Sequence, residues 1–193
     1  MVKYKGGCIP PFNFKRRKNM ENKKIVVFGC DNTGKTTLCN YIKDRFEKTH
    51  DVKEEHSDKI YIAKSIGPNK TVDEYIDFMK DELLNENNVI FDRFPVIEEY
   101  TCGNVLRHKN IFEGELVVPF FKMVNVFVFC YPGLFNTLNW GEREQMDGVK
   151  ENAVDLINSY NLMAYTLKSF GYNVIEYNYK VDTMYDVYKK IFD

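Results

Sequence analysis

One short stretch restricts what this chain can fold into more than any other. Residues 29–36 read Gly-Cys-Asp-Asn-Thr-Gly-Lys-Thr, which is the pattern G-x-x-x-x-G-K-T. The apolar run 25–28 before it predicts a strand, and apolar side chains behind it recur at a spacing of four, which predicts a helix that begins near Lys35. Glycines at these positions let backbone N–H groups and the positive end of the helix dipole surround an anion. The stretch is therefore predicted to be a phosphate-binding loop.

A loop of this type assigns chemistry to particular side chains. Lys35 is expected to reach the β- and γ-phosphates of ATP, and the Thr36 hydroxyl is expected to be a ligand of Mg²⁺. The sequence thus predicts ATP and Mg²⁺ as cofactors. The alternative interpretation is a strand-to-helix turn whose lysine is simply solvated. The residues predicted to contact the nucleotide are Gly29, Asp31, Asn32, Thr33, Gly34, Lys35, Thr36 and Thr37.

Strands and helices are predicted to alternate along the rest of the chain. Apolar runs predict further strands at 60–63, 89–91, 124–130 and 174–177, and helical periodicity predicts helices at 71–84, 97–107, 116–123, 153–167 and 181–191. This alternation is typical of an α/β fold. We expect the three-layer sandwich of P-loop NTPases, a doubly wound parallel sheet of about five strands with helices on both faces. The glycine-rich segment 132–148 predicts a lid.

Length and composition favour one domain. The chain has 193 residues, and its 27 basic and 28 acidic side chains nearly cancel, so there is no global electrostatic argument for nucleic acid or an anionic membrane. No run approaches the roughly 18 apolar residues of a membrane span. Residues 1–20 lack helical or strand periodicity and are expected to be an irregular extension before a compact domain at 21–193. Five scattered cysteines indicate reduced thiols and a cytoplasmic protein.

The next chemical signal is Asp92-Arg93, which follows the predicted strand 89–91. A GTPase would need a guanine-reading N-K-x-D string after a later strand, and the nearest string, at 69–73, has one residue too many. A motor ATPase usually ends this strand with paired carboxylates. An acid beside a base instead fits a site that holds Mg²⁺ on one side and an anionic acceptor on the other.

These motifs resemble those of thymidylate kinases. Residues 29–37 resemble the loop G-x-D-x-x-G-K-S/T-T of that family, and Asp92-Arg93-Phe94 followed by Tyr100 resembles its D-R-Y motif. Related deoxynucleoside kinases carry a similar acid-Arg-Ser motif. The resemblance covers residues 21–193 in outline and is closest to diverged members from phage genomes. It departs at Phe28, where the family often has glutamate, and at 65–68, where its R-x-P-G-G-T segment has no good copy.

The resemblance implies a role for each matching residue. Asp31 is expected to face the acceptor sugar, and Arg93 to bind the acceptor phosphate. Asp92 would act on the metal through water, and Arg143 would close the lid over the transferring phosphoryl group. The implied catalytic residues are therefore Lys35, Asp92, Arg93 and Arg143.

Two weaker candidates complete the acceptor site. Arg107 is a candidate for the acceptor phosphate. Phe94 is a candidate for stacking on the acceptor base, with core packing as an equally good interpretation. A homodimer is expected only from the resemblance.

The implied function is Mg-ATP-dependent phosphoryl transfer to a small-molecule nucleotide acceptor, a deoxynucleoside monophosphate with a dTMP-like acceptor as first choice. A phosphate oxygen is already a nucleophile, so alignment and charge neutralisation would suffice. One alternative is a kinase whose acceptor is a hydroxyl on a deoxynucleoside or on a modified base in DNA, with Asp31 or Asp92 as proton acceptor. Nucleic acid is a partner only under that alternative. A third hypothesis is a regulator that binds ATP without transferring phosphate.

Overall fold

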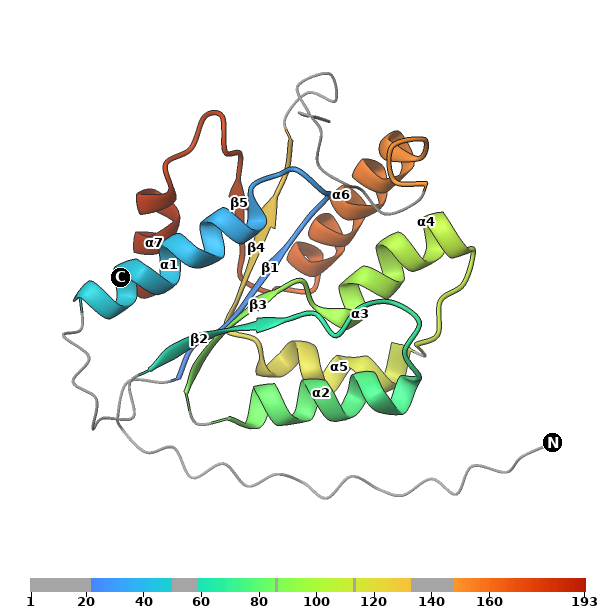
Figure 1. The fold of residues 1–193 in the computed structure, drawn as a ribbon, viewed down its shortest axis with the longest axis horizontal. Helices are drawn as coiled ribbons and strands as arrows, with labels where there is room; N and C mark the ends of the chain where they lie inside the picture. The colour runs from blue at the N-terminus through green and yellow to red at the C-terminus, as the bar shows by residue number, and fades with distance from the viewer. Residues whose placement is uncertain (1–21, 50–58, 86, 113, 133–147) are drawn as a thin grey trace.

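The computed structural model describes residues 22–49, 59–85, 87–112, 114–132 and 148–193. Within these ranges the chain forms one five-stranded sheet in which every pairing is parallel, with the strand order β2-β3-β1-β4-β5 (Figure 1). The predicted five-stranded parallel sheet is confirmed. The strands are β1 (Lys24–Phe28), β2 (Ile60–Lys64), β3 (Asn88–Asp92), β4 (Val126–Cys130) and β5 (Val174–Tyr177).

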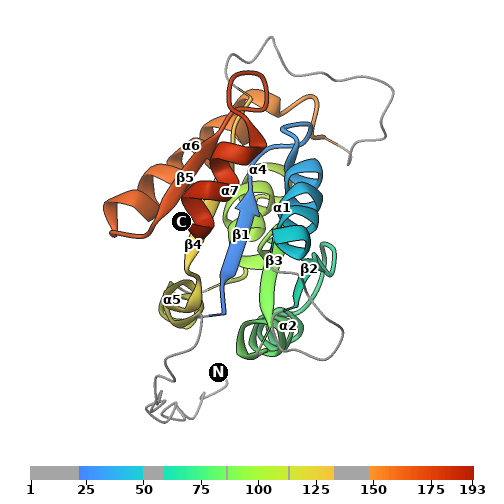
Figure 2. The same cartoon turned by 90° about the vertical axis from the view of Figure 1, so that its left-hand side faces the viewer.

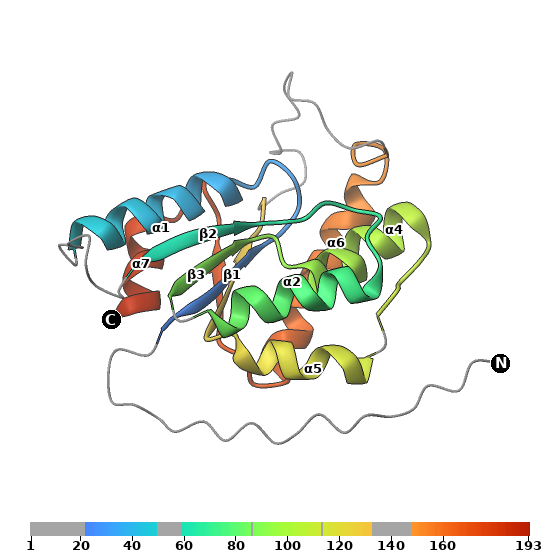
Figure 3. The same cartoon turned by 60° about the horizontal axis from the view of Figure 1, so that its bottom comes forward.

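Helices cover both faces of this sheet. Helices α1 and α7 pack against each other on one face, and α2 and α5 lie side by side on the other, together with α6 (Figure 3). The helices are α1 (Lys35–Thr49), α2 (Val72–Leu84), α3 (Pro95–Glu98), the π-helix η1 (Glu99–Gly103), α4 (Asn104–Arg107), α5 (Gly114–Met123), α6 (Ala153–Ser169) and α7 (Met184–Phe192).

Strand β1 shows why its sequence is apolar throughout. Val26 and Phe28 belong to the core under α2, α5 and α6, whereas Ile25 and Val27 belong to the core under α1 and α7. Successive side chains of a strand point to opposite faces, so a central strand with both faces covered needs an unbroken apolar run. The prediction of a buried first strand is confirmed.

The central strands set the place of the site. β1 and β3 run side by side (Figure 2), and their register pairs Val27 with Asp92. The loop after β1 leads to α1 on one face, whereas the chain after β3 leads to α3 and η1, which pack with the other face. Ligands of open parallel sheets bind at the carboxyl ends of strands where the connections diverge in this way.

Local signals in the sequence explain several helix ends. Thr71 and Glu74 form the predicted capping box of α2, with the Thr71 hydroxyl accepting from the Glu74 N–H at 3.2 Å. Gly171, at φ 81°, ends α6 as predicted, and its N–H donates to the Lys168 carbonyl. Pro119 stands inside α5 without ending it.

Several predicted boundaries were wrong; α5, for example, begins at Gly114 rather than at residue 116. Strand β4 begins at Val126, two residues after the start of the apolar run, and Asn125 before it accepts the Lys24 N–H with its side chain. The helix predicted from Ile97 begins at Pro95, a residue suited to a first helical turn, and contains a π-helical turn. The last helix begins at Met184, because Thr183 caps it, and Val181, predicted on its buried face, is 78% exposed.

Two predictions fall outside the described residues. The extension at 1–20 is one, and the lid at 132–148 is the other except for its two end residues. No described helix combines the length and the apolar character needed to cross a bilayer.

Candidate phosphate-binding loop and acceptor pocket

The loop after β1 has a backbone that ordinary residues cannot adopt. Gly29 has φ 138°, and a Cβ atom there would lie 2.0 Å from the carbonyl oxygen of Cys130 on β4. Gly34 and Asn32 have φ 80° and 60°, which are left-handed conformations that glycine and asparagine tolerate best. Gly29 is therefore required by the close approach of β4 and by its own dihedral angle. Gly34 is required by its dihedral angle.

Lys35 and Thr33 are both held by one backbone carbonyl inside the loop. The Lys35 ammonium donates to the Cys30 oxygen at 2.6 Å, and the Thr33 hydroxyl donates to the same oxygen at 2.7 Å. Lys35 is only 5% exposed, and its Nζ lies 3.8 Å from Oδ1 of Asp31. The structure thus holds the lysine of the loop inside the turn, where a phosphate-binding loop needs it.

Thr36 and Asp92 meet where β1 and β3 end. The Thr36 hydroxyl donates to Oδ2 of Asp92 at 2.8 Å, and Oδ1 of Asp92 is buried without a hydrogen-bond partner among the described residues. Mg²⁺ prefers such oxygen ligands and usually takes only one or two from the protein, with water and substrate phosphates completing its octahedron. The pair therefore fits a magnesium site, although the described residues hold no cluster of three acidic, His or Cys side chains.

Arg93 connects the loop to the next part of the site. Its Nη2 forms an ion pair with Asp31 of the loop, and its Nη1 donates to Oε2 of Glu98 at 3.2 Å. Burial disfavours the guanidinium charge, but the carboxylates of Glu98 and Asp31 raise the pKa of Arg93, so it stays charged. Its backbone has φ 76°, a strained conformation for arginine, and such strain is typical of functional sites.

A cavity of about 200 Å³ opens beside Arg93. Its walls come from the loop after β2, from α2, and from the continuous helical segment formed by α3, η1 and α4. Its lining is Ser65, Gly67, Pro68, Tyr75, Arg93, Pro95, Glu98, Glu99, Cys102 and Arg107. The cavity therefore lies next to the phosphate-binding loop, with Asp31 and Arg93 at their junction.

A second group of polar side chains lines the same cavity. Oε1 of Glu99 accepts from Nη2 of Arg107 at 2.5 Å, and the Tyr75 hydroxyl lies 3.3 Å from that Oε1 and 3.0 Å from the Gly67 carbonyl oxygen. Glu99 is 4% exposed. Burial and the Glu99 carboxylate raise the pKa of Tyr75, so its hydroxyl stays a proton donor.

Glu98 also connects the cavity to α6. Its Oε1 accepts from the hydroxyl of Tyr160 at 2.9 Å, and that hydroxyl lies 3.2 Å from Sγ of Cys102. Burial raises the pKa of Cys102 to about 12, which keeps the thiol protonated. Tyr160 is 1% exposed, so its bond to Glu98 fixes the carboxylate that holds Arg93.

The chain is similar to known proteins in its fold but not in its sequence. No family model and no curated protein sequence matches the chain. Among solved structures, the YorR protein from Bacillus subtilis in complex with phosphorylated GDP matches with a TM-score of 0.62 and 14% identity, covering 88% of this chain and 93% of that one. Deoxyadenosine kinase from M. mycoides with bound dCTP matches with a TM-score of 0.54 and 14% identity, covering 86% and 97%.

A third similar structure is thymidylate kinase from Ehrlichia chaffeensis, with a TM-score of 0.50, 12% identity, and 88% and 96% of the two chains covered. The chain shares the fold of these three proteins. At such low identity the likeness concerns the fold alone, and the predicted P-loop architecture is thereby confirmed.

Within this fold, most of the predicted site residues come together. Asp31, Lys35 and Arg93 are joined by ion pairs, and Thr36 bonds to Asp92. Other predicted loop residues lie around them in the same turn or, in the case of Thr37, on the exposed surface of α1. Arg143 lies outside the described residues.

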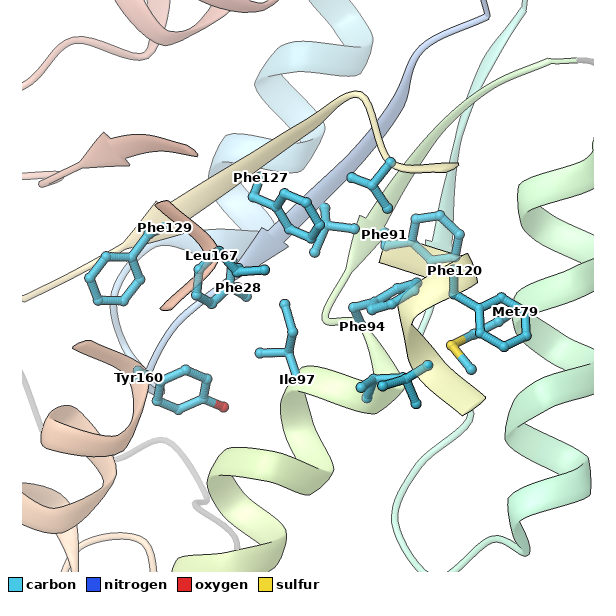
Figure 4. Packing of buried hydrophobic residues seen from close by; sticks show 14 of the residues in the cluster. Phe28, Met79, Phe91, Phe94, Ile97, Phe120, Phe127, Phe129, Tyr160 and Leu167 are labelled. Carbon is cyan, nitrogen blue, oxygen red and sulfur yellow. The ribbon is translucent and has the colours of Figure 1, made fainter. Parts of the chain in front are cut away.

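The suggested stacking role of Phe94 was wrong. Its side chain is 0% exposed, and its ring centroid lies 5.1 Å from that of Phe91 and 6.0 Å from that of Phe121. Figure 4 shows it within the packed cluster of buried hydrophobic side chains, beside Phe91 and Ile97. The alternative interpretation, core packing, is the one that the structure supports.

Sequence reasoning missed three polar residues that line the cavity, and Tyr160, which contacts one of them from α6. Glu98 and Glu99 were unassigned, although two consecutive acids directly after the apolar run 95–97 are a signal that they face protein rather than water. Tyr75 and Tyr160 gave no such signal, because each stands on a helix face that reads as ordinary core.

Proposed function

We propose that this chain is a Mg²⁺-dependent kinase that transfers the γ-phosphoryl group of ATP to a small nucleotide acceptor held in the cavity beside Arg93. The observation that carries the proposal is the ion pair between Asp31 of the phosphate-binding loop and Arg93 of the cavity. A phosphate held by the loop and a molecule held in the cavity would therefore be neighbours. The kinases named among the similar structures support the same function.

The roles follow from the positions of the charges. Backbone N–H groups of the loop and Lys35 would bind the β- and γ-phosphates, and Thr36 and Asp92 would hold Mg²⁺. Arg93 would orient the acceptor and neutralise charge at the transferring group. Bound Mg²⁺ supplies further neutralisation of phosphate charge. Alignment and electrostatic stabilisation of this kind account for most of the catalysis in phosphoryl transfer.

The acceptor proposed first is a deoxynucleoside monophosphate of the dTMP type. Its phosphate would bind Arg93, in part by replacing the present carboxylate partners of the guanidinium. Because a phosphate oxygen is nucleophilic without deprotonation, this acceptor requires no general base. Asp31, which is 15% exposed, would then turn to the acceptor sugar.

One observation favours a second candidate, an acceptor that reacts through a hydroxyl. The charge of Arg93 is already balanced by Asp31 and Glu98, so the described part of the cavity does not offer an unpaired arginine to a phosphate. A hydroxyl acceptor needs a proton acceptor near the transferring group, and the Asp31 carboxylate lies there. Turnover with nucleosides or hydroxymethylated DNA, and none with monophosphates, would distinguish this candidate from the first.

The test is an ADP-release assay with the full chain, Mg-ATP, and a panel of acceptors. The panel contains deoxy- and ribonucleoside monophosphates, nucleosides, and DNA with hydroxymethylated bases. We expect turnover with one acceptor class and none for Lys35→Ala. Tight ATP binding without transfer to any acceptor would contradict the proposal and support a regulator.

A further inference from the structure

The acceptor cavity contains a group of polar side chains that is separate from the phosphate-binding loop and consists of Tyr75, Glu99 and Arg107. Glu99 is almost fully buried, and a buried carboxylate is costly unless it is paired and hydrogen-bonded. Arg107 provides that pairing at 2.5 Å and is itself 29% exposed. All three side chains line the acceptor cavity.

The backbone around this group is shaped to make room for it. Gly103 lies within the helical segment, where glycine is unfavourable by up to ~1 kcal/mol relative to alanine. A Cβ there would lie 2.9 Å from Oε2 of Glu99 and 3.1 Å from Nη2 of Arg107. Residues 99–103 of this segment also form a π-helix. Such helices are rare in proteins, and those that occur are frequently found at functional sites. Two unfavourable features of the backbone, a glycine within a helical segment and a π-helical turn, thus occur beside the Glu99–Arg107 ion pair.

The phosphate-binding loop is paired with Arg93, whereas Glu99 of the polar group is paired with Arg107. Arg93 is paired with Asp31 and so marks the end of the cavity where phosphate would be transferred. Within the described part of the chain, no hydrogen bond or ion pair joins Arg107 or Glu99 to residues 29–36. The group therefore belongs to the part of the cavity that would hold the rest of the acceptor.

The pairing also decides which ligand chemistry Arg107 suits. The Glu99 side chain, at 5% exposed, is more buried than the two carboxylate partners of Arg93, at 15% and 14%, so it cannot readily turn away to make room for a phosphate. Arg107 therefore presents N–H donors with little net positive charge, which suits neutral acceptor atoms better than a phosphate dianion. Oε1 of Glu99 already accepts from Arg107 and lies within hydrogen-bond distance of Tyr75. The other N–H groups of the Arg107 guanidinium remain accessible to a ligand.

We propose that Arg107, oriented by Glu99, is the specificity-determining residue of the acceptor cavity and selects a base with an oxo group at its Watson–Crick edge. This inference rests on the proposed function and assigns Arg107 to the base rather than to the acceptor phosphate. Guanidinium groups donate well to O6 of guanine, whereas an exocyclic amino group at the same position would place donor against donor. O4 of thymine or uracil and O6 of guanine or hypoxanthine match the guanidinium, and the amino groups of cytosine and adenine do not.

The experiment compares acceptors that differ only in this exchange. The matched pairs are uracil against cytosine and hypoxanthine against adenine, each as the deoxynucleoside and as its monophosphate. For the wild-type chain we expect kcat/KM to favour the oxo member of a pair by roughly tenfold to a hundredfold. Equilibrium binding of the same compounds, measured calorimetrically without ATP, should show a preference of the same sign.

Two variants separate recognition from folding. Arg107→Lys keeps a charge opposite Glu99 but loses the planar fork, so the oxo preference should fall to within about threefold. The double variant Glu99→Gln, Arg107→Gln removes both charges together and leaves no unpaired buried ion, and it should lose the preference as well. Arg45→Lys, at an exposed arginine of α1, is the matched control and should leave every ratio unchanged.

The outcomes distinguish this inference from the proposed function. If no compound accepts phosphate but binding favours the oxo members and Arg107→Lys removes that preference, the kinase proposal fails and the assignment of Arg107 stands. If the chain is a kinase but the wild type treats both members of each pair alike or prefers the amino member, the inference is overturned. A preference that survives in both variants overturns it too.

Discussion

The two halves of the site are held together in different ways. The donor half is one contiguous stretch, 29–36, in which the Cys30 carbonyl binds two side chains and glycines allow the turn. The acceptor half takes its polar side chains from α2, α3, η1 and α4, and it is held by two side-chain ion pairs and a hydrogen bond from Tyr160 of α6. The donor half depends on its backbone conformation and should therefore tolerate few substitutions. The acceptor half depends on contacts between side chains, so substitutions there can change its affinity and specificity without loss of the fold.

The largest effect is expected at the backbone of the donor half. In Gly29→Ala the new Cβ would lie 2.0 Å from a carbonyl oxygen of β4 at φ 138°, so we expect a loss of more than ~3 kcal/mol in the free energy of unfolding or no folded protein. Urea denaturation measures this. The matched control is Gly171→Ala, with φ 81° but nothing within 4 Å, which should lose about 1 kcal/mol. Equal losses in the two variants would contradict the argument from close approach.

Loss of a cation from the donor half should abolish turnover and leave the fold intact. For Lys35→Ala we expect kcat to fall roughly 10³-fold or more, because the transferring phosphoryl group loses a fixed positive charge. Circular dichroism and urea denaturation check the fold. Arg93→Ala should also lose turnover, at the junction of the two halves, and near-normal activity in either variant would contradict the assignment of the site.

A change in the acceptor half should act on one substrate only. In Gly103→Ala the added Cβ would lie 2.9 Å from Oε2 of Glu99, 3.0 Å from the Lys109 carbonyl oxygen and 3.1 Å from Nη2 of Arg107, so the Glu99–Arg107 pair must shift. We expect KM for the acceptor to rise about tenfold while KM for ATP stays within about twofold. Steady-state kinetics with each substrate varied in turn measures both constants. Gly114→Ala, where the nearest atom is the Tyr100 hydroxyl at 4.0 Å, is the control. An equal rise in the two KM values would remove the distinction between the halves.

The smallest effect is expected for Tyr160→Phe. The variant removes the hydroxyl that donates to Glu98 and leaves the ring in place, so we expect a loss of about 1–2 kcal/mol in stability. Because Glu98 then holds Arg93 less firmly, kcat/KM for the acceptor should fall several-fold. Thermal unfolding and acceptor kinetics check the two parts. Unchanged kinetics would show that Glu98 needs no support from α6 to orient Arg93.

The same contrast explains what the sequence could predict. The phosphate-binding loop, its flanking strand and helix, and the α2 capping box depend on residues within a few positions of each other, and all were predicted. Asp92 and Arg93 were placed at the site because parallel strands end at a common edge. The five-stranded parallel sheet and the placing of these residues at its edge thus follow from local patterns combined with general rules of α/β folds, whereas the order of the strands was not predicted.

What could not be predicted depends on tertiary contacts. Phe94 stands beside the candidate site residue Arg93 in sequence, but only the packing of Phe91 and Phe121 around it shows that it belongs to the core. Glu99 becomes part of the cavity through Arg107, eight residues later and across a π-helical turn that periodicity does not reveal. The acceptor half was therefore incomplete where its contacts are least local.

The central claim is that phosphate passes from the loop to a molecule in the cavity beside Arg93. The most direct measurement follows γ-³²P-labelled ATP through a single turnover with excess enzyme, the preferred acceptor and Mg²⁺, with Lys35→Ala in parallel. We predict that the label moves to the acceptor with the wild-type chain and stays in ATP with the variant. Label that remains in ATP, or that appears as inorganic phosphate whether or not an acceptor is present, would contradict the claim.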